Sequence, residues 1–89
     1  MTLEIRPAAR LVMVDGVPVQ LTVRQWDLVT FLQAEAGRAV PYEKIYREVW
    51  HQEPLAGAAA TIKVTLWRIR QLTGLPITTL WGFGLRWDG

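Results

Sequence analysis

The 89-residue chain contains no cysteine and no serine. Without cysteine it can form no disulfide, no zinc site built on thiolates and no thiol nucleophile. The single histidine, His51, has no partner ligand at metal spacing. Glu43 and Glu48 are five residues apart on one expected helix, so they point in different directions and make a poor acid–base pair. We therefore expect no catalytic residue, no metal and no cofactor, and predict that the chain is not an enzyme.

Long hydrophobic runs are also missing. Stretches without a charge, such as residues 54–62, are too short and too rich in alanine and glycine to span a bilayer. No apolar signal core follows a basic start at the N-terminus, so the sequence does not predict secretion. A composition of 51% hydrophobic and 20% charged residues is typical of a globular chain rather than a disordered one. We expect one cytoplasmic domain, residues 1–89, with no membrane partner.

Acidic residues are lacking in the C-terminal third. Residues 1–53 carry six basic and seven acidic side chains, a sum of −1, whereas residues 54–87 carry four basic side chains and no acidic one, a sum of +4. The four cations are Lys63, Arg68, Arg70 and Arg86. This asymmetry indicates a polyanionic or acidic partner. The alternative is that four cations spread over this length are ordinary solvated surface charges with no partner.

Short strands are predicted at both ends of the chain. Residues 3–5 and 10–14 are expected as strands, and VMVDGVPVQL places Asp15-Gly16 between two apolar runs, which is typical of a two-residue hairpin with positive φ. Pro7 and Pro18 confine their strands to edges or ends. At the other end, PITTLWGFGLRWDG predicts a hairpin, with Gly82 and Gly84 at its tight tip.

Three segments between these strands have helical signals. Thr22 followed by Gln25 predicts a capping box at the start of the first helix, and Gly37 is expected to end that helix as a left-handed cap. A second helix is expected at about residues 41–50, with Pro41 in its first turn, and a third at about 58–73. The expected inner faces contain Trp26, Leu28, Phe31 and Leu32, then Ile45, Val49 and Trp50, with Trp87 also in the core.

The stretch TIKVTLWRIRQL, residues 61–72, has two different faces when it is drawn as a helix. At about 100° per residue, Ile62, Leu66 and Ile69 fall within about 60° of one another and form the expected core face. The opposite side carries Val64, Trp67, Arg68 and Gln71, with Lys63 beyond Trp67 and Arg70 at the border. An indole exposed to water leaves a large apolar area unburied, which is unfavourable, so this outward face is predicted to bind a partner. The alternative is that Trp67 packs on a neighbouring loop or on the hairpin, against Trp81.

Two helices joined by a loop, the second one basic and followed by a hairpin, have the order of a helix-turn-helix with a wing. The segments GRAVPYEKIYREVW, TIKVTLWRIRQL and ITTLWGFGLRW, with LT before Gln25 and an aromatic residue at 26, resemble the OmpR/PhoB-type winged-helix DNA-binding domain. The resemblance covers nearly the whole chain. It implies an α+β winged helix with N-terminal strands (residues 1–21), a three-helix core (22–74) and a wing hairpin (75–89).

The resemblance also implies a function, that of a double-stranded DNA-binding transcription regulator. In family members the helix similar to residues 58–73 lies in the major groove, the wing reaches an adjacent minor groove or backbone, and the loop before the third helix can contact RNA polymerase. By position, Arg68 would meet phosphate or base edges and Val64 a thymine methyl, while Lys63 and Arg86 would contact phosphates. The expected DNA-binding residues are Lys63, Val64, Trp67, Arg68, Arg70, Gln71, Trp81 and Arg86.

The chain departs from the family pattern at several positions. Trp67 and Trp81 stand where family members carry DNA-facing cations, Ala60 stands where a cation often precedes Thr61, and Pro41 replaces a serine cap. These 89 residues contain no phosphate-accepting receiver of the family, and we expect the domain to act alone or with a receiver on another chain. The alternative function is a protein-interaction module that binds RNA polymerase or an associated protein through a Trp67/Trp81 face. A homodimer on DNA is expected under the first function.

Overall fold

The computed structural model describes residues 2–89, and its N-terminal part is a three-stranded antiparallel sheet. The strands β1 (Leu3–Arg6), β2 (Leu11–Val14) and β3 (Val17–Gln20) lie in the order β1-β2-β3. The predicted hairpin turn is confirmed, because Asp15 and Gly16 have φ of 50° and 81° between the paired residues Val14 and Val17. Pro18 lies on the edge strand β3, where its missing N–H breaks no central ladder.

The first helix, α1 (Val23–Ala34), begins as predicted and ends earlier than predicted. Both halves of the capping box are present, with Gln25 N–H donating to Thr22 Oγ1 at 3.2 Å and Thr22 N–H to Gln25 Oε1 at 3.0 Å. The C-cap is Glu35 rather than Gly37. Gly37 has a φ of 80° and donates its N–H to the Trp87 carbonyl at 2.9 Å, so its left-handed conformation directs the chain toward the last strand.

The second helical region consists of α2 (Tyr42–Ile45) and a π-helical turn (Tyr46–Trp50). Pro41 is the N-cap of α2 rather than a first-turn residue. The reason is that Val40 and Pro41 form a two-residue strand, β4, that the sequence analysis did not predict. His51 ends the region in the left-handed conformation, with φ of 56°, and its N–H donates to the Arg47 carbonyl at 3.1 Å.

The third helix and the wing complete the chain. The helix α3 (Ala58–Leu72) is followed by β5 (Ile77–Leu80) and β6 (Gly84–Trp87), and the second sheet has the order β4-β6-β5. The two wing glycines have different roles, contrary to the prediction that both serve the tip. Gly82 does so, with φ of 71°. A Cβ on Gly84 would lie 1.8 Å from the Val40 carbonyl oxygen, so glycine is required there for β4 to approach β6.

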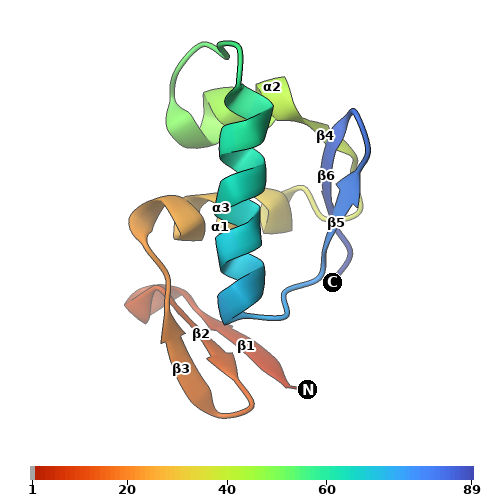
Figure 1. Ribbon diagram of the computed structural model, residues 1–89. Coiled ribbons are helices and arrows are strands. Elements are labelled where there is room, and N and C mark those ends of the chain that lie inside the picture. The colour runs from red at the N-terminus through yellow and green to blue at the C-terminus, as the bar shows by residue number, and fades with distance from the viewer. Residues whose placement is uncertain (1) are drawn as a thin grey trace.

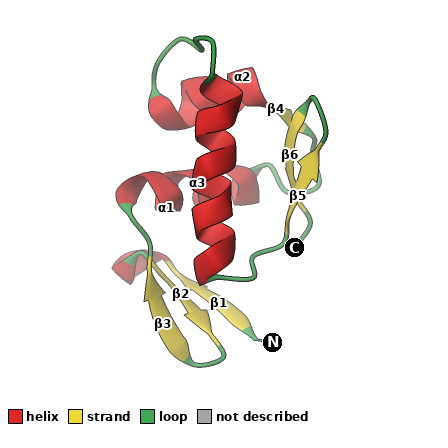
Figure 2. Cartoon of the chain, viewed as in Figure 1, coloured by secondary structure: helices red, strands yellow, loops and turns green. Residues whose placement is uncertain are grey.

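Figures 1 and 2 show the N-terminal sheet at one end of the helices and the wing, coloured blue in Figure 1, alongside α3. Core side chains come from the three helices and from both sheets. Trp26 and Trp87 are buried as predicted, whereas Trp50 is only half-buried, with its ring stacked on Tyr46. Among the described residues, no helix is long and apolar enough to cross a membrane.

The predicted inner faces are largely confirmed by burial. Leu28, Leu32, Ile45, Val49, Ile62, Leu66 and Ile69 are all buried. Phe31 is only half-buried, while Val29, which was not predicted, is fully buried. The difference is a small rotation of the buried stripe around α1, which the spacing of apolar residues alone does not resolve.

Candidate nucleic-acid interface

The outward face of α3 is exposed to solvent. Ile62, Leu66 and Ile69 are buried on one side of the helix, and Lys63, Val64, Trp67, Arg68 and Gln71 are exposed on the other. The Trp67 residue exposes 61% of its surface and Val64 49%. The prediction that Trp67 and Arg68 point away from the core is confirmed, and the alternative that Trp67 packs on the fold is wrong.

Lys63 marks the flank of α3 that faces the wing. Its Nζ lies 5.4 Å from the centroid of the Tyr42 ring. A cleft of about 310 Å³ is lined by Lys63 together with Gly82 and Phe83 of the wing tip. Burial raises the pKa of the Tyr42 hydroxyl, and the positive charge of Arg70 lowers that pKa by less. Lys63 is therefore positioned by an aromatic face and forms no ion pair among the described residues, and Glu43 lines the same cleft.

Arg68 marks the opposite flank, beside the start of α1. It lines a pocket of about 200 Å³ with Thr22, Arg24 and Trp50. The Arg24 guanidinium lies 5.4 Å from the centroid of the Trp50 ring and donates to the Val49 carbonyl, while Trp50 is stacked on Tyr46. Two guanidinium groups thus line one pocket at this flank, an arrangement suited to an anion.

Arg24 was missed by the sequence analysis, although a signal for it exists. It lies in the first turn of α1, where the helix dipole disfavours a positive charge. A cation at that position requires another stabilising contact, and the Trp50 ring supplies one. Arg24 and Arg68 are 44 positions apart in the sequence, so their proximity cannot be predicted before the chain is folded.

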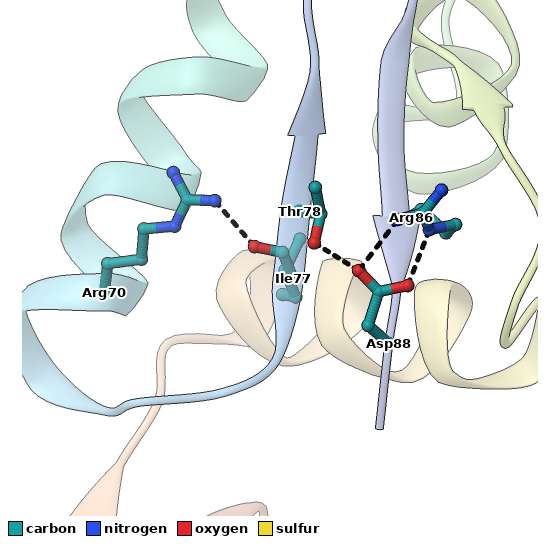
Figure 3. A network of polar contacts seen from close by, with 5 residues as sticks. All are labelled: Arg70, Ile77, Thr78, Arg86 and Asp88. Atoms are coloured by element: carbon teal, nitrogen blue, oxygen red, sulfur yellow. Dashed lines mark hydrogen bonds and ion pairs between the residues drawn. The ribbon is translucent and has the colours of Figure 1, made fainter.

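Two of the predicted DNA-binding arginines make contacts within the fold (Figure 3). Arg70 donates to the Ile77 carbonyl at 2.6 Å. It also donates to Thr79 Oγ1 at 3.3 Å. Arg86 Nε donates to Asp88 Oδ1 at 2.6 Å, and Thr78 donates to the other carboxylate oxygen of Asp88. These contacts raise the pKa of Arg86 and lower that of Asp88. Asp88 lies one residue beyond residues 54–87, so the sum of +4 over those residues overstates the free charge of the wing.

The wing tip presents aromatic rings and no charge. Trp81 is 90% exposed and Phe83 47% exposed, on either side of Gly82. The alternative that Trp81 packs on the fold is therefore wrong. Within residues 2–89 the stacked aromatic pair is Tyr46–Trp50, so Trp67 and Trp81 form no stacked patch. The tip is an exposed apolar contact surface.

This arrangement of strands, three helices and a hairpin defines a winged-helix protein, and its exposed third helix is the candidate binding site. A family model described as "Transcriptional regulatory protein, C terminal" matches residues 16–87. The chain belongs to this family of OmpR/PhoB-type domains, which is a family of regulators and not of enzymes.

Relatives of known name support the same assignment. The chain is 29% identical over 87 residues to the transcriptional regulatory protein ResD of Bacillus subtilis, covering 90% of this chain and 36% of ResD. It is 28% identical over 93 residues to SrrA of Staphylococcus aureus, covering 97% of this chain and 38% of SrrA. The chain thus spans little more than a third of the length of these curated relatives.

Solved structures share the fold. The DNA-binding domain of Bacillus subtilis CssR superposes with a TM-score of 0.85 at 24% identity, covering 96% of this chain and 98% of that one. The Klebsiella pneumoniae RstA DNA-binding domain, solved in complex with the RstA box, has a TM-score of 0.83 at 21% identity and covers 99% and 92%. At these identities the likeness establishes the winged-helix fold.

Proposed function

We propose that this chain binds double-stranded DNA as the effector domain of a transcription regulator in the cytoplasm. In this proposal α3 enters the major groove and the β5–β6 wing lies on the adjacent backbone or minor groove. An α-helix with side chains is about 10–12 Å across, which fits a major groove of about 12 Å. The single observation that carries the proposal is the exposed outward face of α3, with Lys63 and Arg68 and no acidic residue.

Electrostatics support a polyanionic partner. Between Glu53 and Asp88 the described chain has no carboxylate side chain, and Lys63 and Arg68 lie on opposite flanks of α3. Arg24 adds a third cation beside Arg68. Cations on both flanks of a helix can contact the two phosphate backbones that border a major groove, and such contacts set the orientation of the helix.

The number of cations predicts the salt dependence of binding. Each neutralised phosphate contributes a slope of about −0.9 to the plot of log affinity against log salt concentration. Contacts from Lys63, Arg68, Arg24 and Arg70 give a slope of about −3.6, whereas adding Arg86 would give about −4.5. Arg86 is paired with Asp88, while the hydrogen bonds of Arg24 and Arg70 to backbone carbonyls leave their charges in place, so we expect the smaller slope. Binding by one small unit is weak, so we also propose tandem half-sites or a homodimer on DNA.

The test is a fluorescence anisotropy titration of a labelled random-sequence duplex from low to moderate salt. Arg68→Ala is expected to weaken binding to every duplex and to reduce the slope by about 0.9, since one phosphate contact is lost. Arg6→Ala is the matched control, because Arg6 lies on β1 and is paired with Glu4 at 3.3 Å. Equal affinity of the Arg68→Ala variant and the unaltered chain would remove α3 from the DNA interface.

A second candidate function is favoured by the exposed indoles. Trp81 and Trp67 expose 90% and 61% of their surfaces, and exposed tryptophans are frequent anchors of protein interfaces. Under this alternative the Trp67 and Trp81 surfaces contact RNA polymerase or an associated protein. The discriminating result is the absence of binding to random duplex at low salt, together with capture of purified RNA polymerase that is lost in Trp67→Ala and Trp81→Ala.

A further inference from the structure

The centre of the exposed α3 face is a stripe of three side chains, Val64, Trp67 and Gln71, which we term the central stripe. Their positions lie within about 60° of one another around the helix axis. All three are exposed, and none is charged. The cations lie to either side, since Lys63 contacts Tyr42 beside the wing and Arg68 lines the pocket beside α1.

The central stripe lacks the groups that read G·C pairs. Guanine is read by an arginine or lysine that donates to its O6 and N7 atoms, and cytosine by a carboxylate that accepts from its N4 amine. Arg70 is bound to the Ile77 carbonyl and Thr79 of the wing, and Arg68 lies on the flank. No carboxylate is present on α3. The middle of the helix therefore has no arginine or lysine that could donate to guanine O6 and N7. The Gln71 amide oxygen is the one side-chain acceptor of the central stripe for the N4 amine of cytosine.

The groups that the central stripe does carry match an A·T pair. Val64 and Trp67 are apolar, and the C5-methyl of thymine is the apolar group exposed in the major groove. Gln71 has an amide that can both donate to N7 and accept from the N6 amine of adenine. We propose that α3 reads A·T-rich DNA, with Val64 and Trp67 on thymine methyls and Gln71 on adenine. This inference rests on the proposed function, and it adds the base composition of the target.

The exposed areas support methyl recognition. Val64 is 49% exposed and Trp67 61%, so each has apolar surface that remains in water in the free protein. Contact with a thymine methyl removes apolar surface of both the side chain and the methyl group from water, which is favourable. The contribution of one buried methyl corresponds to about a fourfold change in affinity, and two methyls to about 15-fold.

The experiment begins with selection of duplexes from a random pool by the 89-residue chain. The expected result is an enriched core rich in A·T pairs. Each thymine in the selected 20-bp duplex is then replaced by deoxyuridine, which lacks only the C5-methyl. We expect about a fourfold loss of affinity for each contacted methyl, measured by anisotropy. Replacing the contacted adenine by 7-deazaadenine, which lacks N7, tests Gln71 in the same way.

Variants assign each effect to its side chain. In Val64→Ala and Trp67→Ala, the ratio of affinities for the thymine and uracil duplexes at the corresponding position is expected to fall toward one. Leu72→Ala is the matched control, because Leu72 is also an exposed apolar residue of α3 but lies off the central stripe. Its thymine-to-uracil ratio is expected to equal that of the unaltered chain. Thermal melts by circular dichroism confirm that these surface variants remain folded.

The outcomes separate this inference from the proposed function. Enrichment of a G·C-rich core, or uracil substitution without effect at every position, overturns A·T reading while DNA binding itself stands. An unchanged ratio of affinities for the thymine and uracil duplexes in both Val64→Ala and Trp67→Ala also overturns A·T reading by these residues, since other residues would then contact the methyls. Failure to bind any duplex at low salt overturns both the proposed function and this inference.

Discussion

Replacing Gly84 with alanine is expected to destabilise the fold far more than replacing Gly82, although both glycines lie in the wing. A Cβ on Gly84 would lie 1.8 Å from the Val40 carbonyl oxygen and 2.9 Å from the Pro41 Cα. Both atoms belong to the backbone, so no side chain can turn aside to relieve the overlap. The strands β4 and β6 must then separate, which disrupts the pairing of Val40 with Leu85.

The magnitude follows from the overlap and from the hydrogen bonds at risk. Overpacking costs about 1–3 kcal/mol, and each lost backbone hydrogen bond about 1 kcal/mol. One such bond joins Tyr42 N–H to the Phe83 carbonyl at 3.1 Å, next to the overlap. We expect about 3 kcal/mol in total, out of a free energy of unfolding of roughly 4–13 kcal/mol for a chain of this length. The melting temperature is then expected to fall by about 12–24 °C.

Gly82→Ala is the matched control for this prediction. Gly82 has a φ of 71°, but no atom lies within 4 Å of a Cβ built there. The cost is therefore conformational only, about 1 kcal/mol. Urea denaturation followed by tryptophan fluorescence measures both variants. The loss of one backbone hydrogen bond alone would cost about 1 kcal/mol. If Gly84→Ala lowers the free energy of unfolding by no more than this, the close approach of β4 to β6 is refuted.

Three further predictions concern the cap, the wing ion pair and the indoles. Thr22→Ala removes one half of the capping box and is expected to cost about 1 kcal/mol in urea denaturation, whereas Thr22→Ser retains the cap. Because the pKa of Asp88 is lowered in the folded state, its contribution to stability is present above the unfolded pKa and is lost as the pH falls through the folded pKa. Asp88→Asn should therefore remove part of the acid sensitivity of the melting temperature, and free Arg86 to steepen the salt slope by about 0.9. Under the proposed DNA-binding function, the double variant Trp67→Arg and Trp81→Arg is expected to change the selected duplex sequence with little change in affinity for random duplex. Tighter binding to random duplex at low salt would instead favour the protein-interaction alternative.

Much of the fold could be predicted because its signals are local. The Asp15-Gly16 turn and the Thr22–Gln25 capping box depend on backbone sterics and hydrogen bonds within four residues, and both are confirmed. The two faces of α3 depend on helical periodicity, so the exposure of Trp67 and Arg68 could also be predicted. In each case the residues that determine the structure are close in sequence.

Contacts between distant segments could not be predicted in the same way. β4 has only two residues, too few for any periodicity, and it exists because β6 lies beside it. The need for glycine at position 84 comes from the same pairing rather than from the hairpin tip. Arg24 lies beside Arg68 only because α1 and α3 pack together.

The candidate site shows the same division between sequence and tertiary structure. Residue types and helical periodicity were enough to predict that α3 is amphipathic, that its outward face carries an indole among cations, and that no carboxylate lies on it. How those cations are held became clear only in the fold, where Arg70 donates to the wing strand β5 and Arg86 is paired with Asp88. Charge follows from residue type, whereas the contacts of a charged group depend on the partners that folding places within hydrogen-bonding distance.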